Sequence, residues 1–234
     1  MKKWQWVLIV LLGVGMIASQ YLDFIASPPE AQMGNVVRIM YFHIASAMLA
    51  FTAFGVTAIF GVVFLVKKQW VWDQMARVSA EIGLVFTTFV LISGSIWGDA
   101  VWNAWWTWDP TLTTTLILWF LFMAYPLLRA SIADRERAAK VASVYGLIAA
   151  VDIPIIHQSV TWWHGIHPNV ITAQGFNMPP SMVYTLLFSL VVFLGLYVVI
   201  LWIGTMMAKD HDQLNELREQ VRNVLTKYDE RIDS

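Results

Sequence analysis

The chain has 234 residues, of which 58% are hydrophobic and 13% are charged, and its formal net charge is −1. Because soluble domains carry about 25% charged residues, this composition excludes an ordinary soluble enzyme and favours a polytopic membrane protein. The absence of cysteine excludes disulfides, thiolate metal sites and thiol catalysis. There is no basic arm, so the charge gives no indication of a nucleic-acid partner.

Six apolar segments reach the length of about 20 residues that a membrane-spanning helix needs. They are predicted at 4–22, 36–66, 78–97, 112–128, 141–159 and 181–207. The sequence therefore predicts an all-α integral membrane protein with six transmembrane helices. The second segment is roughly 46 Å long at 1.5 Å per residue, so we expect it to tilt or to project from the membrane. The first follows Lys2 and Lys3 as a signal peptide would, but 18–21 is a poor cleavage site and we expect it to be retained.

Basic residues set the expected orientation. With a cytoplasmic N-terminus, 14 of the 15 Lys and Arg residues lie inside and only Arg38 lies outside, which predicts an N-in, C-in topology. The outer loops are then 23–35, 98–111 and 160–180, and they hold six of the eight prolines. These loops are expected to be stiff and not helical throughout. The phosphate-binding motif of P-loop ATPases is absent, which excludes ATP hydrolysis by that route.

The polar tail at 209–234 carries an apolar stripe with alternating spacings of three and four. The stripe consists of Leu214, Leu217, Val221, Val224 and Tyr228. This pattern predicts a short amphipathic cytoplasmic helix. We favour a helix that lies against the membrane face or the loops, and a docking helix for a cytoplasmic partner is the alternative.

The second outer loop is rich in tryptophan. Five tryptophans fall close together, at Trp97, Trp102, Trp105, Trp106 and Trp108. An interfacial belt places one or two tryptophans at each helix end, so this cluster favours a broad aromatic surface for a flat, conjugated, apolar ligand. Asp109 follows the cluster and precedes Pro110, where it is expected to cap the next helix and to hold the loop rigid.

Four of the five histidines lie toward the predicted outer side, at His43, His157, His164 and His167. His43 is about two turns into the second helix, whereas His167 is in the third outer loop after Trp162 and Trp163. A helix-borne and a loop-borne histidine can approach a flat ligand from opposite sides, as two axial haem ligands do. A zinc site needs further ligands at short spacing, and no acid or cysteine beside His164 completes one.

Three other polar residues have more than one interpretation. Asp152 and His157 lie in the fifth segment with Pro154 between them. We expect Pro154 to kink the helix and to free a backbone carbonyl. For His157 we favour a hydrogen bond to the backbone or to another helix over a role as a metal ligand. Arg38 is five residues before His43, where contact with a haem propionate and ordinary capping of the loop are equally compatible with its position.

The spacing of Trp97-Gly98, Trp102, Trp105-Trp106, Trp108-Asp109 and Leu112-Thr113 is similar to the "WWD" motif of the haem-handling proteins of cytochrome c biogenesis. With six spans and this length, residues 1–208 resemble the haem exporter protein C (CcmC) family of the cytochrome c maturation system. Larger proteins that share the motif usually have more spans.

The resemblance implies a role for each matching residue. His43 and His167 match axial ligands of a non-covalent haem b, and His164 is an alternative to His167. The aromatic platform and its anchor are implied to be Trp97, Trp102, Trp105, Trp106, Trp108 and Asp109, with Trp162 and Trp163 preceding the second ligand. Thr111 departs from the motif, because many members of the family have arginine at that position. A propionate contact at Thr111 is therefore in doubt, which makes Arg38 more interesting as a contact for the propionate.

The resemblance also implies a function without catalysis. Members hold haem at the periplasmic face of the bacterial inner membrane and deliver it to a membrane-anchored haem chaperone. Other implied partners are the membrane and ATPase subunits of an ABC transporter and a small single-span accessory subunit. A lyase-like role in attaching haem to the chaperone stays open.

Two other functions are weighed against haem delivery. A b-type electron-transfer protein would hold its histidines in mid-membrane. A haem-translocating permease subunit would line a path with polar residues, and beyond Asp152, Glu81 and the threonines of the fourth helix the spans offer few.

Overall fold

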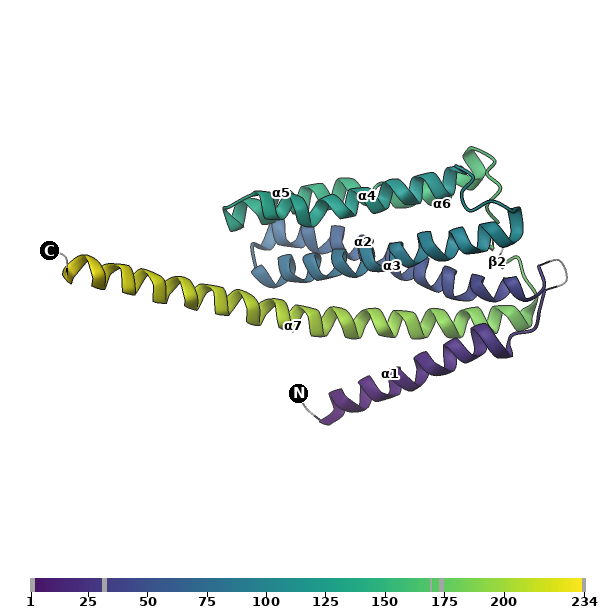
Figure 1. Ribbon diagram of the computed structural model, residues 1–234, viewed down its shortest axis with the longest axis horizontal. Coiled ribbons are helices and arrows are strands. Elements are labelled where there is room, and N and C mark those ends of the chain that lie inside the picture. The colour runs from purple at the N-terminus through teal and green to yellow at the C-terminus, as the bar shows by residue number, and fades with distance from the viewer. Residues whose placement is uncertain (1–2, 31–32, 169, 173–174, 233–234) are drawn as a thin grey trace.

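A computed structural model describes residues 3–30, 33–168, 170–172 and 175–232, without the side chains of 171, 226, 227 and 229–232. Within these ranges the helices are α1 (Lys3–Tyr21), α2 (Arg38–Lys67), α3 (Trp70–Trp102), α4 (Pro110–Ser131), α5 (Arg135–Ala149), α6 (Asp152–Trp162) and α7 (Pro180–Ile232), with a π-turn at Leu22–Ala26 and a 3-10 turn at Asn35–Val37 (Figure 1). Strands β1 (Ile171–Thr172) and β2 (Gly175–Phe176) form one short antiparallel pair. Six helical stretches of the described chain are long and apolar enough to cross a membrane, which confirms the predicted fold class.

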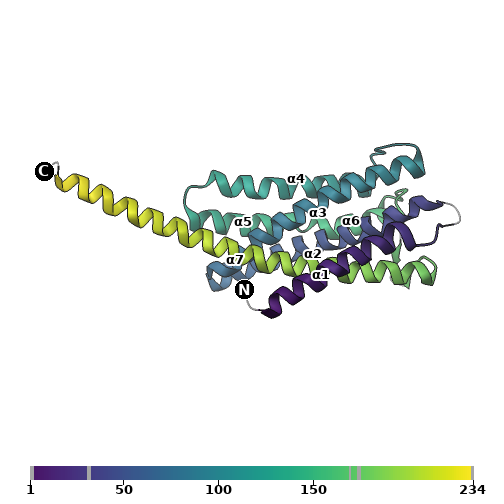
Figure 2. The ribbon, with the colours of Figure 1, turned by 60° about the horizontal axis from the view of Figure 1, so that its bottom comes forward.

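The bundle has two distinct ends. Both termini, the α2–α3 turn and the α4–α5 turn lie at one end, which we call the terminal end (Figures 1 and 2). The opposite end, which we call the aromatic end, holds the segment 103–109 and the described parts of the α1–α2 connection and of the segment 163–179. The excess of basic residues at the terminal end is the reason to expect that it faces the cytoplasm.

A tight turn makes α2 and α3 an antiparallel hairpin. Lys68 ends α2 in the left-handed conformation (φ 56°), and its N–H donates to the Phe64 carbonyl at 2.8 Å. The third helix then begins at Trp70 and continues to Trp102, well beyond the expected span of 78–97. The first part of the tryptophan cluster is therefore helical, and only residues 103–109 form a loop.

The fifth span is divided into α5 and α6. Pro154 has no N–H, so the Ala150 carbonyl cannot accept its usual helical hydrogen bond and accepts one from Ile153 N at 3.2 Å. The break at 150–151 confirms the expected kink. Asp152 lies directly after the break, is 9% exposed, and has one carboxylate oxygen without a hydrogen-bond partner among the described residues.

The separate short helix expected in the tail is not seen in residues 209–232, the part of the tail that the structure describes. α7 runs without interruption from Pro180 to Ile232 and projects far beyond the terminal end of the bundle (Figure 1). All five residues of its apolar stripe are more than half exposed. The stripe therefore packs against neither the loops nor the rest of the bundle.

The core is centred on α2, which contacts α3, α5 and α7. Phe54 of α2 stacks on Phe122 of α4 with ring centroids 3.6 Å apart. Gly83 of α3 is required beside them, because a Cβ there would lie 2.4 Å from the Phe54 ring. Near the terminal end, Arg129 donates two hydrogen bonds of 2.7 and 2.8 Å to the Asp73 carboxylate, which joins α4 to α3.

Candidate functional site

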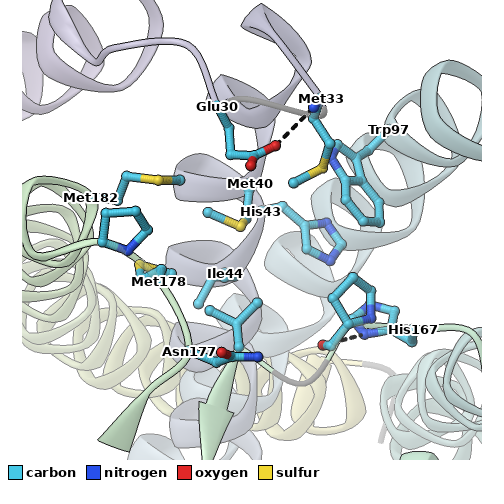
Figure 3. A pocket seen from close by; sticks show the side chains of 13 residues that line it. Glu30, Met33, Met40, His43, Ile44, Trp97, His167, Asn177, Met178 and Met182 are labelled. Atoms are coloured by element: carbon cyan, nitrogen blue, oxygen red, sulfur yellow. Dashed lines mark hydrogen bonds between the residues drawn. The ribbon is translucent and has the colours of Figure 1, made fainter.

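Two histidines from distant parts of the chain meet at the aromatic end. His43 lies on α2 and His167 lies in the segment between α6 and β1, and their ring centroids are 6.4 Å apart with an interplanar angle of 36° (Figure 3). Histidine–metal bonds are about 2 Å long, so a metal held between two imidazoles separates their centroids by about 6 Å. The observed spacing therefore suits one metal ion between the two rings.

Hydrogen bonds leave the Nε2 atom of each ring available. Ser93 Oγ donates to the Phe89 carbonyl at 2.6 Å, so it accepts from His43 Nδ1–H at 2.9 Å. His167 Nδ1 is 3.3 Å from the Pro168 carbonyl, which can only accept. Both Nδ1 atoms thus carry the proton, and a neutral imidazole with this tautomer presents an Nε2 lone pair to a metal.

The surroundings keep His167 neutral. Burial lowers the pKa of His167 below its ordinary value of 6.5, and this effect exceeds the opposing effects of the Pro168 carbonyl and the Asp109 charge. A lowered pKa favours the neutral imidazole, the form whose second ring nitrogen can bind a metal.

Two cavities adjoin the histidine pair. The larger, of about 290 Å³, is lined by Glu30, Met33, Met40, His43, Ile44, Trp97, His167, Pro168, Val170, Asn177, Met178, Pro179 and Met182 (Figure 3). The smaller, of about 40 Å³, is lined by His43, Trp97, Trp102, Trp106, Thr111, His167 and residues of α3 and α4. His43, Trp97 and His167 border both cavities. The four methionines give the larger cavity a flexible and polarizable apolar wall.

Three of the tryptophans that the sequence singles out line these cavities. Trp97 is buried against Trp102, with their rings edge to face at 5.2 Å, and Trp106 borders the smaller cavity. The indole nitrogens of Trp97 and Trp106 are buried and have no hydrogen-bond partner among the described residues. These are donors that an oxygen atom of a bound molecule can satisfy.

The other four tryptophans lie outside both cavities. Trp105 and Trp108 are 61% and 71% exposed, and Trp162 and Trp163 are 60% and 55% exposed. Trp108 packs edge to face against Trp106, with ring centroids 5.7 Å apart, so it supports a residue of the cavity wall. The seven tryptophans thus divide into an inner group that can touch a ligand and an outer group on the surface.

Asp109 joins the two loops of the site. Its side chain accepts from Thr111 N at 2.9 Å, which caps α4 as expected, and its second oxygen accepts from Ile166 N at 2.7 Å. Gly165 permits this contact, because a Cβ there would lie 2.5 Å from Asp109 Oδ2. The carboxylate therefore holds the residue directly before His167.

Arg38 and Thr111 have structural partners. Arg38 donates to the backbone carbonyls of Phe24 and Ser27 at 2.8–3.2 Å and lines neither cavity, so the structure favours loop capping over propionate contact. Thr111 borders the smaller cavity. Its hydroxyl donates to Ser159 Oγ at 2.7 Å, because Ser159 itself donates to the Ile156 carbonyl.

The remaining outer histidines are not part of the pair. His157 and His164 are exposed and border neither cavity. Within the described part of the chain no hydrogen bond joins the ring of His157 to another group, so the hydrogen bond favoured for it is not seen. His164 has a φ of 51°, which points to a role in the turn before His167.

Sequence reasoning missed Ser93 and Gly94, which seat His43. Ser93 orients the ring, and a Cβ on Gly94 would lie 3.1 Å from His43 Cε1. A signal for this pairing does exist, because His43 and Ser93 both lie 25 residues from Lys68. In an antiparallel hairpin centred on Lys68, such residues lie side by side.

Comparison with known proteins gives a consistent result. A family model described as "Heme exporter protein C" matches residues 1–221. Proteins with that name are similar to this chain in Haemophilus influenzae (36% identity, covering 81% of this chain and 76% of the relative) and in Escherichia coli K12 (34%, covering 80% and 74%). A third protein of that name, from Bradyrhizobium diazoefficiens, is 33% identical, and the match covers 82% of this chain and 72% of the relative.

The family match covers nearly the whole bundle and includes both histidines and the tryptophan segment. The relatives are matched over more than two thirds of their own length. The chain therefore belongs to the heme exporter protein C family, a family of haem-handling membrane proteins of cytochrome c maturation.

Proposed function

We propose that the protein binds haem b non-covalently at the aromatic end, with His43 and His167 as axial ligands, and delivers it to a membrane-anchored haem chaperone on the periplasmic side. The observation that carries this proposal is the pair of imidazoles 6.4 Å apart, each with Nδ1 in a hydrogen bond and Nε2 available. Bound haem supplies an iron atom that accepts two nitrogen ligands.

The walls of the site suit a flat apolar macrocycle. Trp97, Trp102 and Trp106 provide aromatic edges and faces on one side, and the methionines of the larger cavity provide adaptable apolar contacts on the other. Neither a lysine nor an arginine lines either cavity, and Glu30 borders the larger one. The propionates of haem are therefore expected to point away from Glu30 and out of the site.

The outer tryptophans support a role in delivery. Large aromatic side chains are exposed near the two segments that Asp109 joins: Trp105 and Trp108 in 103–109, and Trp162 and Trp163 at the end of α6. Exposed patches of this kind serve as contact surfaces for proteins or membranes. We assign this patch to the chaperone, which must approach a bound haem closely to receive it.

The wider assembly follows from the family. We propose that the protein works in the bacterial inner membrane with the membrane and ATPase subunits of an ABC transporter and a small single-span accessory subunit. In that assembly it binds and transfers haem without catalysing a reaction of its own. His43 is near the start of α2 and His167 is in the segment between α6 and β1, so both lie toward the aromatic end. This placement disfavours a b-type electron-transfer protein with ligands in mid-membrane.

The test is transfer between purified components. Haem-loaded protein is mixed with the haem-free chaperone in detergent, the two are separated, and haem is measured on each. We expect haem to move to the chaperone and the bis-histidine spectrum to disappear from this protein at the same rate. A protein that binds no haem, or that keeps it in the presence of the chaperone, would contradict the proposal.

Trp106 and Trp105 are neighbours with opposite placements, which gives a matched pair of variants. Trp106→Ala removes a wall of the smaller cavity and is expected to weaken haem binding about 10-fold or more, because burial of a large aromatic side chain is worth about 1.5–3 kcal/mol. Trp105→Ala is expected to leave haem affinity within about twofold and to slow transfer to the chaperone. Haem titration and the transfer assay measure the two effects, and equal loss of affinity in both variants would contradict this division.

Ser93 is expected to act on haem only through His43. Ser93→Ala removes the acceptor of the His43 Nδ1 proton and should weaken haem binding by about 10–100-fold, as loss of a hydrogen bond to a metal-binding histidine does. Thr87→Val is the control, because Thr87 lies on the same helix, borders neither cavity, and its hydroxyl donates to the Gly83 carbonyl of its own helix. Haem titration compares them, and identical affinities would show that Ser93 does not position the ligand.

A further inference from the structure

Glu81 is a carboxylate in an unusual place on the outside of the bundle. It lies on α3 and is exposed, and no hydrogen bond or ion pair joins it to any described residue. It lies inside the expected span of 78–97, about one turn beyond Arg77. A charged side chain inside a membrane span is costly and usually has a partner.

The face that carries Glu81 is a continuous exposed stripe. Toward the aromatic end it continues through Val85, Phe89, Ile92 and Ile96, which are 41–53% exposed. The stripe spans residues 81–96, a rise of about 22 Å along the helix, which is most of the thickness of the hydrocarbon core. It is long enough to contact one transmembrane helix along most of its length.

Hollows lie on both sides of Glu81. One, of about 580 Å³, lies between α3 and α7 and includes Ile200, Gly204 and Met207. The other, of about 420 Å³, lies between α3 and the α4–α5 pair. Figure 1 shows α3 between these helices. Glu81 therefore stands on a ridge between two hollows that the side chains of a neighbouring helix can fill.

The cation nearest along the helix does not neutralise Glu81. Arg77 is one turn closer to the terminal end, and its ion pair is with Asp212 of α7 at 3.7 Å. Arg129 and Arg135 also border the second hollow, but their partners are Asp73 for the first and Asp212 and Glu216 for the second. His211 of α7 borders the first hollow together with Arg77, and among the described residues no hydrogen bond or ion pair joins either of them to Glu81. The charge of Glu81 thus has no cationic partner within the described chain.

We infer that the α3 stripe is a docking surface for a transmembrane helix of another subunit, and that this helix carries a lysine or arginine opposite Glu81. Lipid tails supply no donor to a carboxylate inside a span, whereas a neighbouring helix supplies both a cation and the apolar contacts. The inference rests on the proposed assembly with other membrane subunits, but Glu81 itself lies away from the haem site, which is at the aromatic end.

The experiment is photo-cross-linking in native membranes. A photoreactive phenylalanine at position 85 is expected to link to one transmembrane peptide of a different protein, and mass spectrometry should find a lysine or arginine in that peptide. Glu81→Leu should reduce the yield at least fivefold, whereas Glu219→Leu, on the projecting part of α7, should not. Exchanging the charges, with Glu81→Lys and the partner's cation changed to Glu, should restore the yield.

Other results would overturn the inference. These are adducts with lipid alone, with a second copy of this chain, or with a helix that has no lysine or arginine, and a yield that Glu81→Leu leaves unchanged. The haem spectrum of Glu81→Leu is the folding control and is expected to match the wild type. Glu81→Gln serves as a second variant if the leucine substitution prevents insertion.

Discussion

Replacing His43 or His167 with alanine is expected to remove the low-spin haem spectrum of the purified protein and to leave weak high-spin binding. Each imidazole supplies one of two axial nitrogens, and the rings are placed for a single metal between them. Loss of a residue that only supports a metal ligand typically weakens binding by about 10–100-fold, or about 1.4–2.7 kcal/mol. The loss of haem affinity here should be larger, because a direct ligand is removed. Absorption spectra during haem titration measure both effects.

The matched controls are the two outer histidines that border neither cavity. His157→Ala and His164→Ala should retain the low-spin spectrum and the wild-type affinity. If His164→Ala and not His167→Ala abolished the low-spin signal, the alternative ligand would be correct. If both His43→Ala and His167→Ala kept the wild-type spectrum, the axial assignment would be wrong.

Asp109→Ala is expected to reduce both stability and haem binding. It removes the cap of α4, worth about 1 kcal/mol, and the carboxylate acceptor of the partly buried Ile166 N–H, worth about 1.5–3 kcal/mol at most. His167 then loses its fixed position, so haem affinity should fall about 10–100-fold and part of the bound haem should become high-spin. Thermal unfolding and haem titration provide the two measurements.

A second helix cap separates the two effects of Asp109. Asp134 caps α5 at the terminal end by accepting from Arg137 N at 2.7 Å. Asp134→Ala should lower stability without changing the haem spectrum, because no part of the site lies nearby. Asp109→Asn should fall between wild type and Asp109→Ala, since an amide still caps the helix but accepts more weakly. Equal haem binding in both alanine variants would show that Asp109 acts only as a cap.

The main features of the site could be predicted from local sequence. The tryptophan spacing, Asp109 before Pro110, and the placement of His43 and His167 near the same membrane face all follow from composition, caps and span lengths. The kink at Pro154 is also a local effect, because the missing N–H acts within one turn. The structure then adds the contact between the two histidine rings.

The division of the tryptophans could not be predicted in this way. Trp105 and Trp106 are adjacent in sequence, yet one is exposed and the other borders a cavity. The difference depends on the backbone of a loop, where Trp108 has a φ of 54° and neither helical nor strand periodicity applies. The continuous α7 was missed because hydropathy marks the end of a span and not the end of a helix.

The sequence alone determined the membrane class, the six spans and the haem-handling family, and it predicted candidate iron ligands, because these depend on composition and on short-range spacing. The tertiary structure decided which of those residues meet. His43 and His167 are 124 positions apart, and their approach depends on the packing of α2 against α3 and on the Asp109 link between two loops. The same packing decides that Glu81 is left on the outer face. Contacts of this range arise from how helices pack, which no local pattern encodes.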